Sequence, residues 1–392
     1  MTEVEVLFLI LAGIYLLQCI GWAPLESEVL RIGRRFRATV LPRKLPLRFG
    51  QHKLFLLNPF LPLAGAFVLE SFPSVGNKYE GLPAAQPTAS RSSALTGRRT
   101  IRINWQEKHQ IRSAGKEVRF ADHVLFIAHT EAYASFLAGL LDRVRRKSPK
   151  ERDRAFEHEF EKMFDTKAVT LRLEEYRSQS TFLRTACVLL FVFLFLMAPV
   201  LIWLRGIERV WPVLLAYLVW SLAWIGWSFL RAHRELYPGQ KDGRWQHVMV
   251  LALSPFSAIR ANDVLLRDLF CAFHPLAVAN VLLSKEEFRL EAERTLRQSL
   301  FRADGDATSS DGAMGRALES FLVKTGMPRE ELLRSPHRES QNCRTYCPLC
   351  LAQFVVAEGE CPDCGEVQLK TFPPESASAR PDRTSLTGTA GS

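Results

Sequence analysis

The sequence lacks the short motifs by which many enzymes are identified. It contains no glycine-rich phosphate-binding loop, no His-Glu-x-x-His zinc helix and no Gly-x-Ser-x-Gly nucleophile elbow. Acidic residues are in the minority, because 41 Asp and Glu stand against 51 Lys and Arg and leave a formal net charge of +10. This balance suits an anionic lipid surface, nucleic acid or the cytosolic face of a membrane protein. No local motif indicates a reaction.

Charge is absent altogether from two long runs, residues 185–204 and 210–230. Each run has the roughly 20 apolar residues that an α-helix needs to cross the hydrocarbon of a bilayer. Only residues 205–209 separate them, so we predict a transmembrane helical hairpin over 185–230. Neither run has an acidic or basic residue at mid-depth, which argues against an ion or proton path through the hairpin.

Residues 6–23 form a third uncharged run. The residues before it, Glu3 and Glu5, are acidic, whereas a secretory signal begins with basic residues. We therefore predict that residues 1–23 are a retained transmembrane anchor. Basic residues then follow from Arg31 to Lys53 with no acidic residue among them. The positive-inside rule places the N-terminus outside and the C-terminus in the cytosol.

The basic stretch from Arg31 to Lys53 allows two interpretations. It is either a topology signal alone or also a binding site for anionic lipid headgroups, at about 1 kcal/mol per basic residue near the surface. Nucleic acid is the less favoured partner, because residues 335–392 are not dense in Lys and Arg.

Residues 24–148 are predicted to hold the basic segment and a small cytosolic α+β module. Within them, 54–69 are uncharged, but Pro59 and Pro62 leave pieces too short to span, so two buried strands or an interfacial loop are expected instead. After a turn-rich loop at 82–98, the expected elements are a strand at 100–105, a hairpin at 111–120, a strand at 124–128 and a helix at 130–146. In this layout the module resembles pleckstrin-homology-like domains.

The rest of the chain reads as helices and a tail. Residues 149–184 are predicted to form a charged cytosolic helix that leads into the hairpin, and its aromatic stripe indicates a packing surface. Residues 231–334 are expected to form a cytosolic or interfacial helical region, with a capping box at residues 284–287. Residues 372–392 are predicted to be a disordered tail.

The strongest local signal lies near the C-terminus. Two Cys-x-x-Cys pairs are separated by ten residues, and Gly365 follows the second pair. Each pair directs two sulfur atoms at one ion about 2.3 Å away, and the glycine allows the tight turn of a metal-binding knuckle. The predicted metal ligands are Cys347, Cys350, Cys361 and Cys364.

With short strands expected beside these knuckles, residues 343–371 resemble the zinc ribbons, rubredoxin-like in their knuckles, that end many uncharacterised bacterial multi-pass membrane proteins. The resemblance implies a structural zinc ion, with iron as the alternative, and a bacterial inner membrane as the location. Four thiolates leave no open coordination position, which argues against a catalytic metal. Leu351 stands where such knuckles commonly have glycine, and Cys343 is either a substitute ligand or a free thiol.

The predicted architecture is a mixed membrane protein with three transmembrane α-helices, a small cytosolic α+β module, a helical region and a C-terminal zinc ribbon. The expected function is that of a membrane-tethered scaffold whose ribbon recruits an unknown cytosolic protein. The alternative is a membrane enzyme or a transport accessory subunit with a site in the helical region, around His233, His247 and His274. Their irregular spacing does not predict that these histidines converge.

Overall fold

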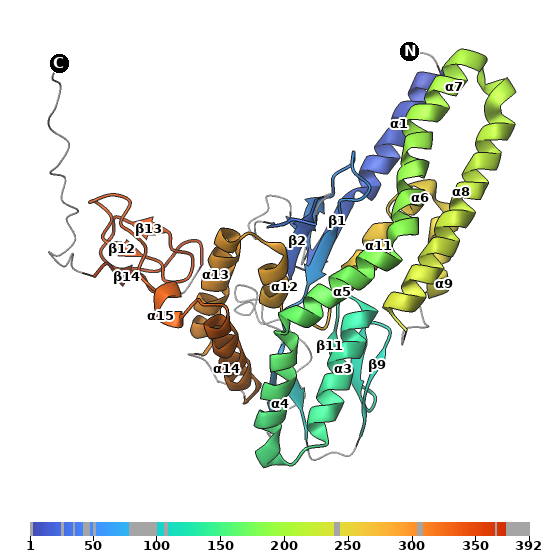
Figure 1. The fold of residues 1–392 in the computed structure, drawn as a ribbon. Coiled ribbons are helices and arrows are strands. Elements are labelled where there is room, and N and C mark those ends of the chain that lie inside the picture. Colours follow the sequence, from blue (N-terminus) through green and yellow to red (C-terminus); the bar gives the residue numbers. More distant parts are fainter. Residues whose placement is uncertain are drawn as a thin grey trace, which may run out of the picture.

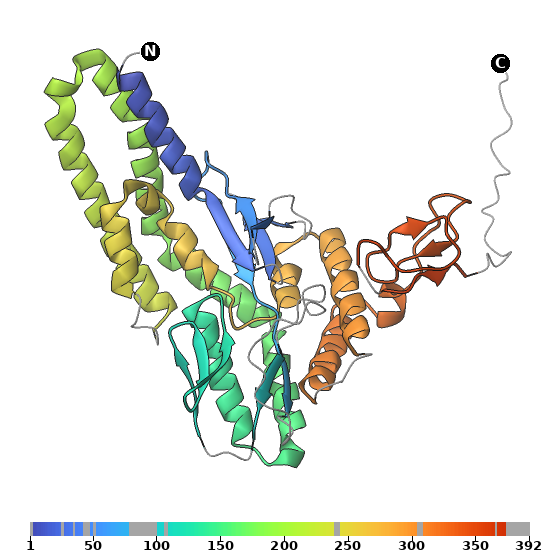
Figure 2. The ribbon, with the colours of Figure 1, turned by 180° about the vertical axis from the view of Figure 1, so that it is seen from behind.

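The computed structural model describes residues 3–24, 27–33, 36–41, 48–49, 52–77, 100–105, 109–238, 244–303, 309–364 and 367–373. A pair of long helices stands at one end of the molecule, short helices and small sheets form a body, and a ribbon lies on the other side of that body (Figure 1). Figure 2 shows the same order from behind. The loop at 82–98 and almost all of the predicted tail lie outside the described residues.

The two long helices form the predicted hairpin. The first comprises α6 (Thr181–Val192), a π-helical turn η1 (Phe193–Met197) and α7 (Ala198–Arg205), and the second is α8 (Ile207–Leu236). Both are long and apolar enough to cross a membrane. Gly206 alone separates them, with a φ of 75° that favours glycine, so the turn is shorter than the five residues expected.

The π-helical turn has a cause in the sequence. Pro199 has no N–H and its ring would collide with the carbonyl one turn earlier in a regular helix. The chain avoids this collision by widening the preceding turn, so that the amide of Ala198 bonds the carbonyl of Phe193, five residues back. The helix therefore continues through the proline to Arg205.

The predicted third span is not shown. Helix α1 (Glu3–Gln18) has 16 residues, and the chain then turns into strand β1 (Ile20–Pro24) instead of continuing as a helix to residue 23. At 1.5 Å per residue the helix is about 24 Å long, less than the roughly 30 Å of a hydrocarbon core. It lies along the hairpin with its N-terminus near the turn, and its Phe8 ring stands 6.3 Å from the ring of Phe195 (Figure 1).

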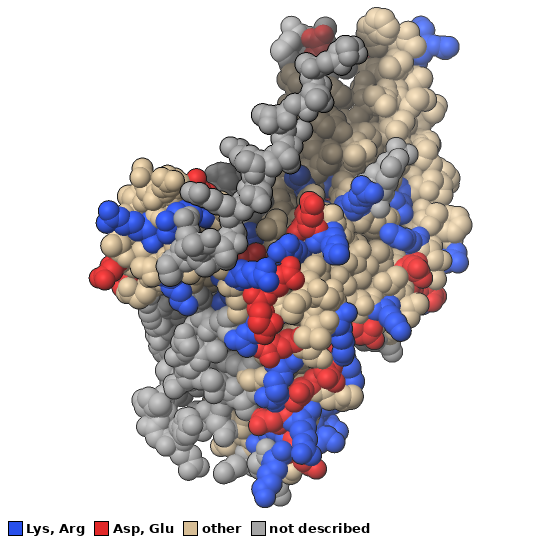
Figure 3. Space-filling view, turned by 60° about the vertical axis from the view of Figure 1, so that its left-hand side comes forward, with Lys and Arg blue, Asp and Glu red and all other residues tan. Residues whose placement is uncertain are grey.

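Charge is distributed unevenly over the surface. Figure 3 shows Lys, Arg, Asp and Glu crowded over the body, whereas the hairpin is almost free of them except at its tip. Large apolar side chains are exposed there: Leu196, Met197, Val200, Trp203, Val213, Leu215, Val219 and Trp220. Contiguous apolar surface of this extent is rare on proteins surrounded by water.

The strands pair in several small sheets. The strands before residue 104 are β1, β2 (Glu28–Ile32), β3 (Ala38–Val40), β4 (Arg48–Phe49), β5 (His52–Leu56), β6 (Ala66–Leu69), β7 (Ser74–Asn77) and β8 (Thr100–Ile103). They form the antiparallel orders β1-β5-β4 and β3-β2-β6 and the parallel pair β7-β8. Strands β5 and β6 confirm that residues 54–69 are not a further span.

The predicted hairpin, strand and helix after residue 110 are present. Strands β9 (Ile111–Ala114), β10 (Glu117–Phe120) and β11 (His123–Ile127) form one antiparallel sheet, and Gly115 turns with a φ of 57°. Helix α3 (Glu131–Arg145) packs on this sheet, and the Thr130 hydroxyl accepts a hydrogen bond from the amide of Tyr133 as its cap.

The charged segment before the hairpin consists of two helices rather than one. Helix α4 (Pro149–Met163) ends at Phe164, and the carboxylate of Asp165 caps α5 (Thr166–Gln179). Because the carboxylate accepts from the amides of Lys167 and Ala168, the chain restarts a helix in a new direction. The aromatic stripe on α4 is buried, as expected for a packing surface.

The region after the hairpin is helical, as predicted. It consists of α9 (Arg244–Leu253), α10 (Pro255–Ile259), α11 (Ala261–Arg267), α12 (Pro275–Leu282), α13 (Lys285–Ala303), α14 (Ser309–Lys324) and α15 (Arg329–Leu332). Ser284 and Glu287 form the expected capping box of α13. One continuous core of buried residues runs from Tyr15 to Leu332, so the hairpin base and the body are packed together.

Candidate metal centre

The ribbon is built on one small antiparallel sheet of three two-residue strands beside its cysteines. Strand β12 (Thr345–Tyr346) pairs with both β13 (Gln353–Phe354) and β14 (Lys370–Thr371). The first knuckle follows β12 directly, and an isolated bridge between Glu360 and Gln368 frames the second. The strands thus bring two turns that are distant in sequence to one place.

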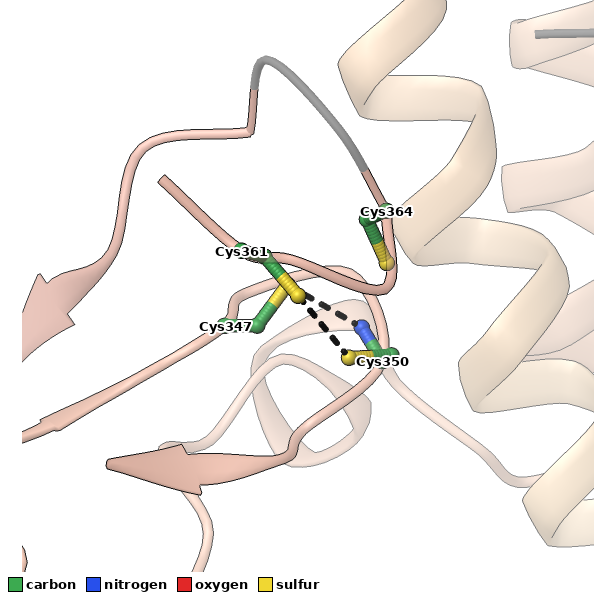
Figure 4. A group of neighbouring side chains, drawn as sticks. All are labelled: Cys347, Cys350, Cys361 and Cys364. Carbon is green, nitrogen blue, oxygen red and sulfur yellow. Dashed lines mark hydrogen bonds between the residues drawn. The ribbon is translucent and has the colours of Figure 1, made fainter. Parts of the chain in front are cut away.

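The four predicted ligands converge on one point (Figure 4). The sulfur atoms of Cys347, Cys350, Cys361 and Cys364 all lie within 4.8 Å of one another, and those of Cys350 and Cys361 are 3.6 Å apart. A tetrahedral ion with sulfur at about 2.3 Å requires sulfur atoms about 3.8 Å apart. The cysteines are therefore placed to bind one metal ion, and zinc fits the sulfur-only donor set.

The first knuckle takes its expected form despite Leu351. This residue has a φ of 63°, in the left-handed region that favours glycine, and its amide donates to the carbonyl of Cys347 at 2.9 Å. The amides of Leu349 and Cys350 lie 3.4 and 3.5 Å from the Cys347 sulfur. Both amides thus face the sulfur, and the turn is preserved at the cost of backbone strain at one leucine.

Burial and hydrogen bonding shift the pKa values of three of these thiols in different directions. Burial raises the pKa of Cys350 to about 11 and raises that of Cys364 as well. Burial acts in the same direction on Cys361, but bonds from the amides of Cys364 and Asp363 outweigh it and lower the pKa of this thiol. A metal ion binds thiolates, so its binding must release the protons of the raised thiols.

The ribbon is fixed to the helical body through one buried arginine. The side chain of Arg297 on α13 is 5% exposed, and its guanidinium donates to the carbonyls of Leu332, Arg334 and Pro348. Pro348 lies inside the first knuckle. Glu293, one turn earlier on α13, neutralises the charge at 2.9 Å. A single side chain thus connects the helix, the segment after α15 and the metal site.

Cys343 does not join the four ligands. The group of metal-ligating side chains found among the described residues contains only the four cysteines of the two knuckles. The amide of Cys343 bonds the carbonyl of Ser340, before β12 begins. The structure therefore agrees with the free-thiol interpretation.

The three histidines of the alternative site do not form such a group. His233 and His247 both lie against Phe229, with ring distances of 5.7 and 6.2 Å. His274 instead caps α12 and stacks on Phe164 at 4.3 Å. Burial lowers the pKa of His274 to about 3, so it is a neutral packing residue. Among the described residues no cluster of three metal ligands includes them.

Part of the basic stretch has a structural role. Lys53 is buried and donates to the carbonyl of Ser27, and Arg31 reaches the carbonyl of Leu56 at 3.4 Å. A buried lysine is not available to a headgroup, so the lipid interpretation does not extend to Lys53. Residues 34–35 and 42–47, which carry other basic side chains of the stretch, lie outside the described residues.

A buried polar cluster under the hairpin has no counterpart in the sequence predictions. Arg260 donates to the carbonyls of Asn58, Leu61 and Ala64 and pairs with Asp263 at 2.7 Å. Beside it the hydroxyl of Tyr176 donates to the side-chain oxygen of Asn262. Burial raises the pKa of Asp263 to about 7, against the opposing charges of Arg260 and Arg267. The only hint in the sequence is that polar residues 260, 262 and 263 interrupt an apolar stretch.

No family model, curated protein or solved structure matches the chain. What the site can do is therefore inferred from its own residues. These are four convergent thiols, enough to fill a tetrahedral coordination shell, in a ribbon that is attached to the helical body through Arg297.

Proposed function

We propose that the protein is anchored in a membrane by the α6–α8 hairpin and uses the ribbon to recruit a protein partner to that membrane. The observation that carries the proposal is the separation of the two parts. The apolar hairpin and the cysteine ribbon stand on opposite sides of the body, with α13 and α14 between the body and the ribbon (Figures 1 and 2). A ribbon held in this way faces water and partners rather than lipid.

Zinc in the cysteine cluster serves folding rather than reaction in this proposal. Four thiolates fill a tetrahedral shell and leave no position for water or substrate. The ribbon has few buried apolar residues of its own, chiefly Tyr346 beside the buried Cys347 and Cys361, so a metal ion is needed to hold its turns. Exposed Val355 and Val356 then offer an apolar contact beside β13.

The orientation belongs to the same proposal. The N-terminus of α1 and the Gly206 turn lie at one end of the molecule, which agrees with an acidic N-terminus outside and a basic body inside (Figure 1). A membrane-impermeant thiol reagent applied to intact cells should label Gly206→Cys and not Gly115→Cys. Labelling of Gly115→Cys alone would show that the protein has the opposite orientation.

Recruitment is tested by crosslinking in native membranes. A photoreactive residue at Val355 should give an adduct with one discrete protein, and Val356→Asp should abolish it while zinc content stays at about one per chain. A photoreactive residue at Leu290, which is equally exposed on α13, serves as the matched control and should give no such adduct. Identical adduct patterns from Val355 and Leu290 would contradict recruitment through the ribbon.

A further inference from the structure

The segment after the hairpin returns along it. Helix α8 ends at Leu236, and α9 then packs against α8 in the opposite direction. Two contacts fix the register. The ring of Phe229 stands 6.2 Å from that of His247, and a side-chain carbon at Gly226 would lie 3.9 Å from Val248. Each step forward along α9 is therefore a step back along α8, toward the Gly206 turn.

The register places α9 at the depth of the hairpin's uncharged run. With 248 beside 226, residue 244 stands level with 230 and residue 253 level with 221. The uncharged run of α8 covers residues 210–230, so Arg244 lies beside its cytosolic boundary, together with Arg231. At 1.5 Å per residue, Leu253 lies about 14 Å inside that boundary, close to the middle of a roughly 30 Å hydrocarbon layer.

A contact on the other helix gives the same depth. Phe256, the second residue of α10, packs its ring 6.4 Å from the ring of Phe195. Phe195 is in the middle of the first uncharged run, 185–204. The ring of Phe256 also stands 6.4 Å from that of Tyr15 on α1. The inner side of the α9–α10 turn thus packs against helices that themselves occupy the apolar layer.

The backbone at this tip is suited to a medium without water. Pro255 has no amide donor, and the amide of Ser254 bonds the carbonyl of Val250 at 3.1 Å. The Ser254 hydroxyl accepts from the amide of Ser257, and the Ser254 carbonyl accepts from Ala258. Within hydrocarbon, irregular backbone is tolerated only where its polar groups are bonded internally in this manner.

We infer that residues 245–259 form a re-entrant segment that enters the bilayer from the side of the body, turns near mid-depth at Ser254-Pro255 and leaves again at Arg260. The partner of its outer face is lipid acyl chains. That face is apolar and exposed at Trp245, Met249, Val250 and Leu253, and it continues the exposed face of α8 at Val219, Trp220 and Trp227. Arg260, where the segment leaves the layer, is buried in protein and pairs with Asp263, so that its charge does not face the acyl chains.

The inference rests on the proposed insertion of the hairpin, so the experiment measures both. A spin label is attached to Leu253→Cys in the full-length, zinc-loaded chain carrying Cys343→Ser, in phosphatidylcholine and phosphatidylglycerol vesicles. Two positions with comparable exposure serve as controls: Leu253 is 80% exposed, Val213 on α8 65% and Leu171 on α5 65%. Collision rates with oxygen, which concentrates in hydrocarbon, and with a polar nickel chelate, which stays in water, are compared.

The oxygen-to-nickel ratio at Leu253, near mid-depth, should equal or exceed that at Val213, which lies nearer the outer boundary. It should exceed the ratio at Leu171 by at least about tenfold, because polar solutes partition poorly into hydrocarbon. A label at Val250, one turn nearer the boundary, should give a ratio between those at Leu253 and Leu171. It repeats the test if Leu253→Cys does not fold. Nickel access at Leu253 with lipid exposure at Val213 would overturn the re-entrant segment alone. Nickel access at Val213 would overturn the insertion itself. A Leu253 label reached by neither reagent would show that protein, such as a second copy, covers the face.

Discussion

Replacing Arg297 by methionine should detach the ribbon from the helical body without removing its metal ligands. Methionine keeps much of the length and apolar contact of the arginine stem but has no donor for the carbonyls of Leu332, Arg334 and Pro348. It also leaves Glu293 without its partner. The ribbon and α13 would then have lost the hydrogen bond from Arg297 that joins them at the knuckle.

The magnitude follows from burial. Breaking a buried, hydrogen-bonded ion pair by removing one partner costs about 3–5 kcal/mol. The Glu293 side chain keeps 21% of its surface exposed and is partly rehydrated, so the low end, about 3 kcal/mol, applies. Because about 1.4 kcal/mol is a factor of ten in an equilibrium, local opening should become roughly 100-fold more frequent.

Amide hydrogen exchange measures this opening directly. In Arg297→Met the amides of residues 329–334 and of the first knuckle should exchange roughly 100-fold faster, with amides of α3 unchanged. Arg289→Met is the matched control on the same helix, because Arg289 pairs with Glu331 of α15 at 3.5 Å but is 56% exposed. An exposed pair contributes less than about 1 kcal/mol. Equal effects from the two variants, or none from Arg297→Met, would refute the role of the buried arginine.

Three further predictions concern pH, metal and the buried cluster. Burial raises the pKa of Asp263 in the folded protein to about 7, so folding takes up a proton between about pH 4 and pH 7. The stability of the fold should therefore fall as the pH rises from about 4 to about 7 and then level off. Thermal unfolding of the detergent-solubilised protein should show this slope, and Asp263→Asn should flatten it. Removal of the metal by a chelator should abolish hydrogen-exchange protection in residues 345–371 and leave the helical circular dichroism signal nearly intact. Cys361→Ser should have the same two effects, and elemental analysis should show the loss of about one zinc per chain. Tyr176→Phe leaves the buried side-chain oxygen of Asn262 without its donor and should cost about 1–3 kcal/mol in denaturant unfolding.

The hairpin and the metal ligands were predictable because each depends on short-range sequence. Two uncharged runs of sufficient length specify two apolar helices, and four cysteines at knuckle spacing specify one ion. The cap of α3 by Thr130 and the turn at Gly115 are equally local. In all of these, the residues that decide the structure are neighbours in the chain.

The errors come from contacts between distant segments. Helix α1 stops at Gln18 because residues 20–24 pair with β5, about thirty residues away, and hydropathy alone does not reveal that pairing. The ribbon's attachment through Arg297 joins residues 51 positions apart, and the Arg260 cluster joins α11 to a loop 202 positions earlier. No periodicity within a window of the sequence carries this information.

In the proposed orientation, the single-residue turn at Gly206 leaves little of the described chain beyond the outer end of the hairpin. Of the described residues, this turn and the first residues of α1 lie at that end of the hairpin (Figure 1). The side chains of Trp203 and Trp211, close to the turn in sequence, are exposed. So small a surface, as far as the chain is described, offers few donors or acceptors to an external ligand. In the proposed insertion, a signal or partner would reach the described part of this protein from the side of the body, or through the lipid itself.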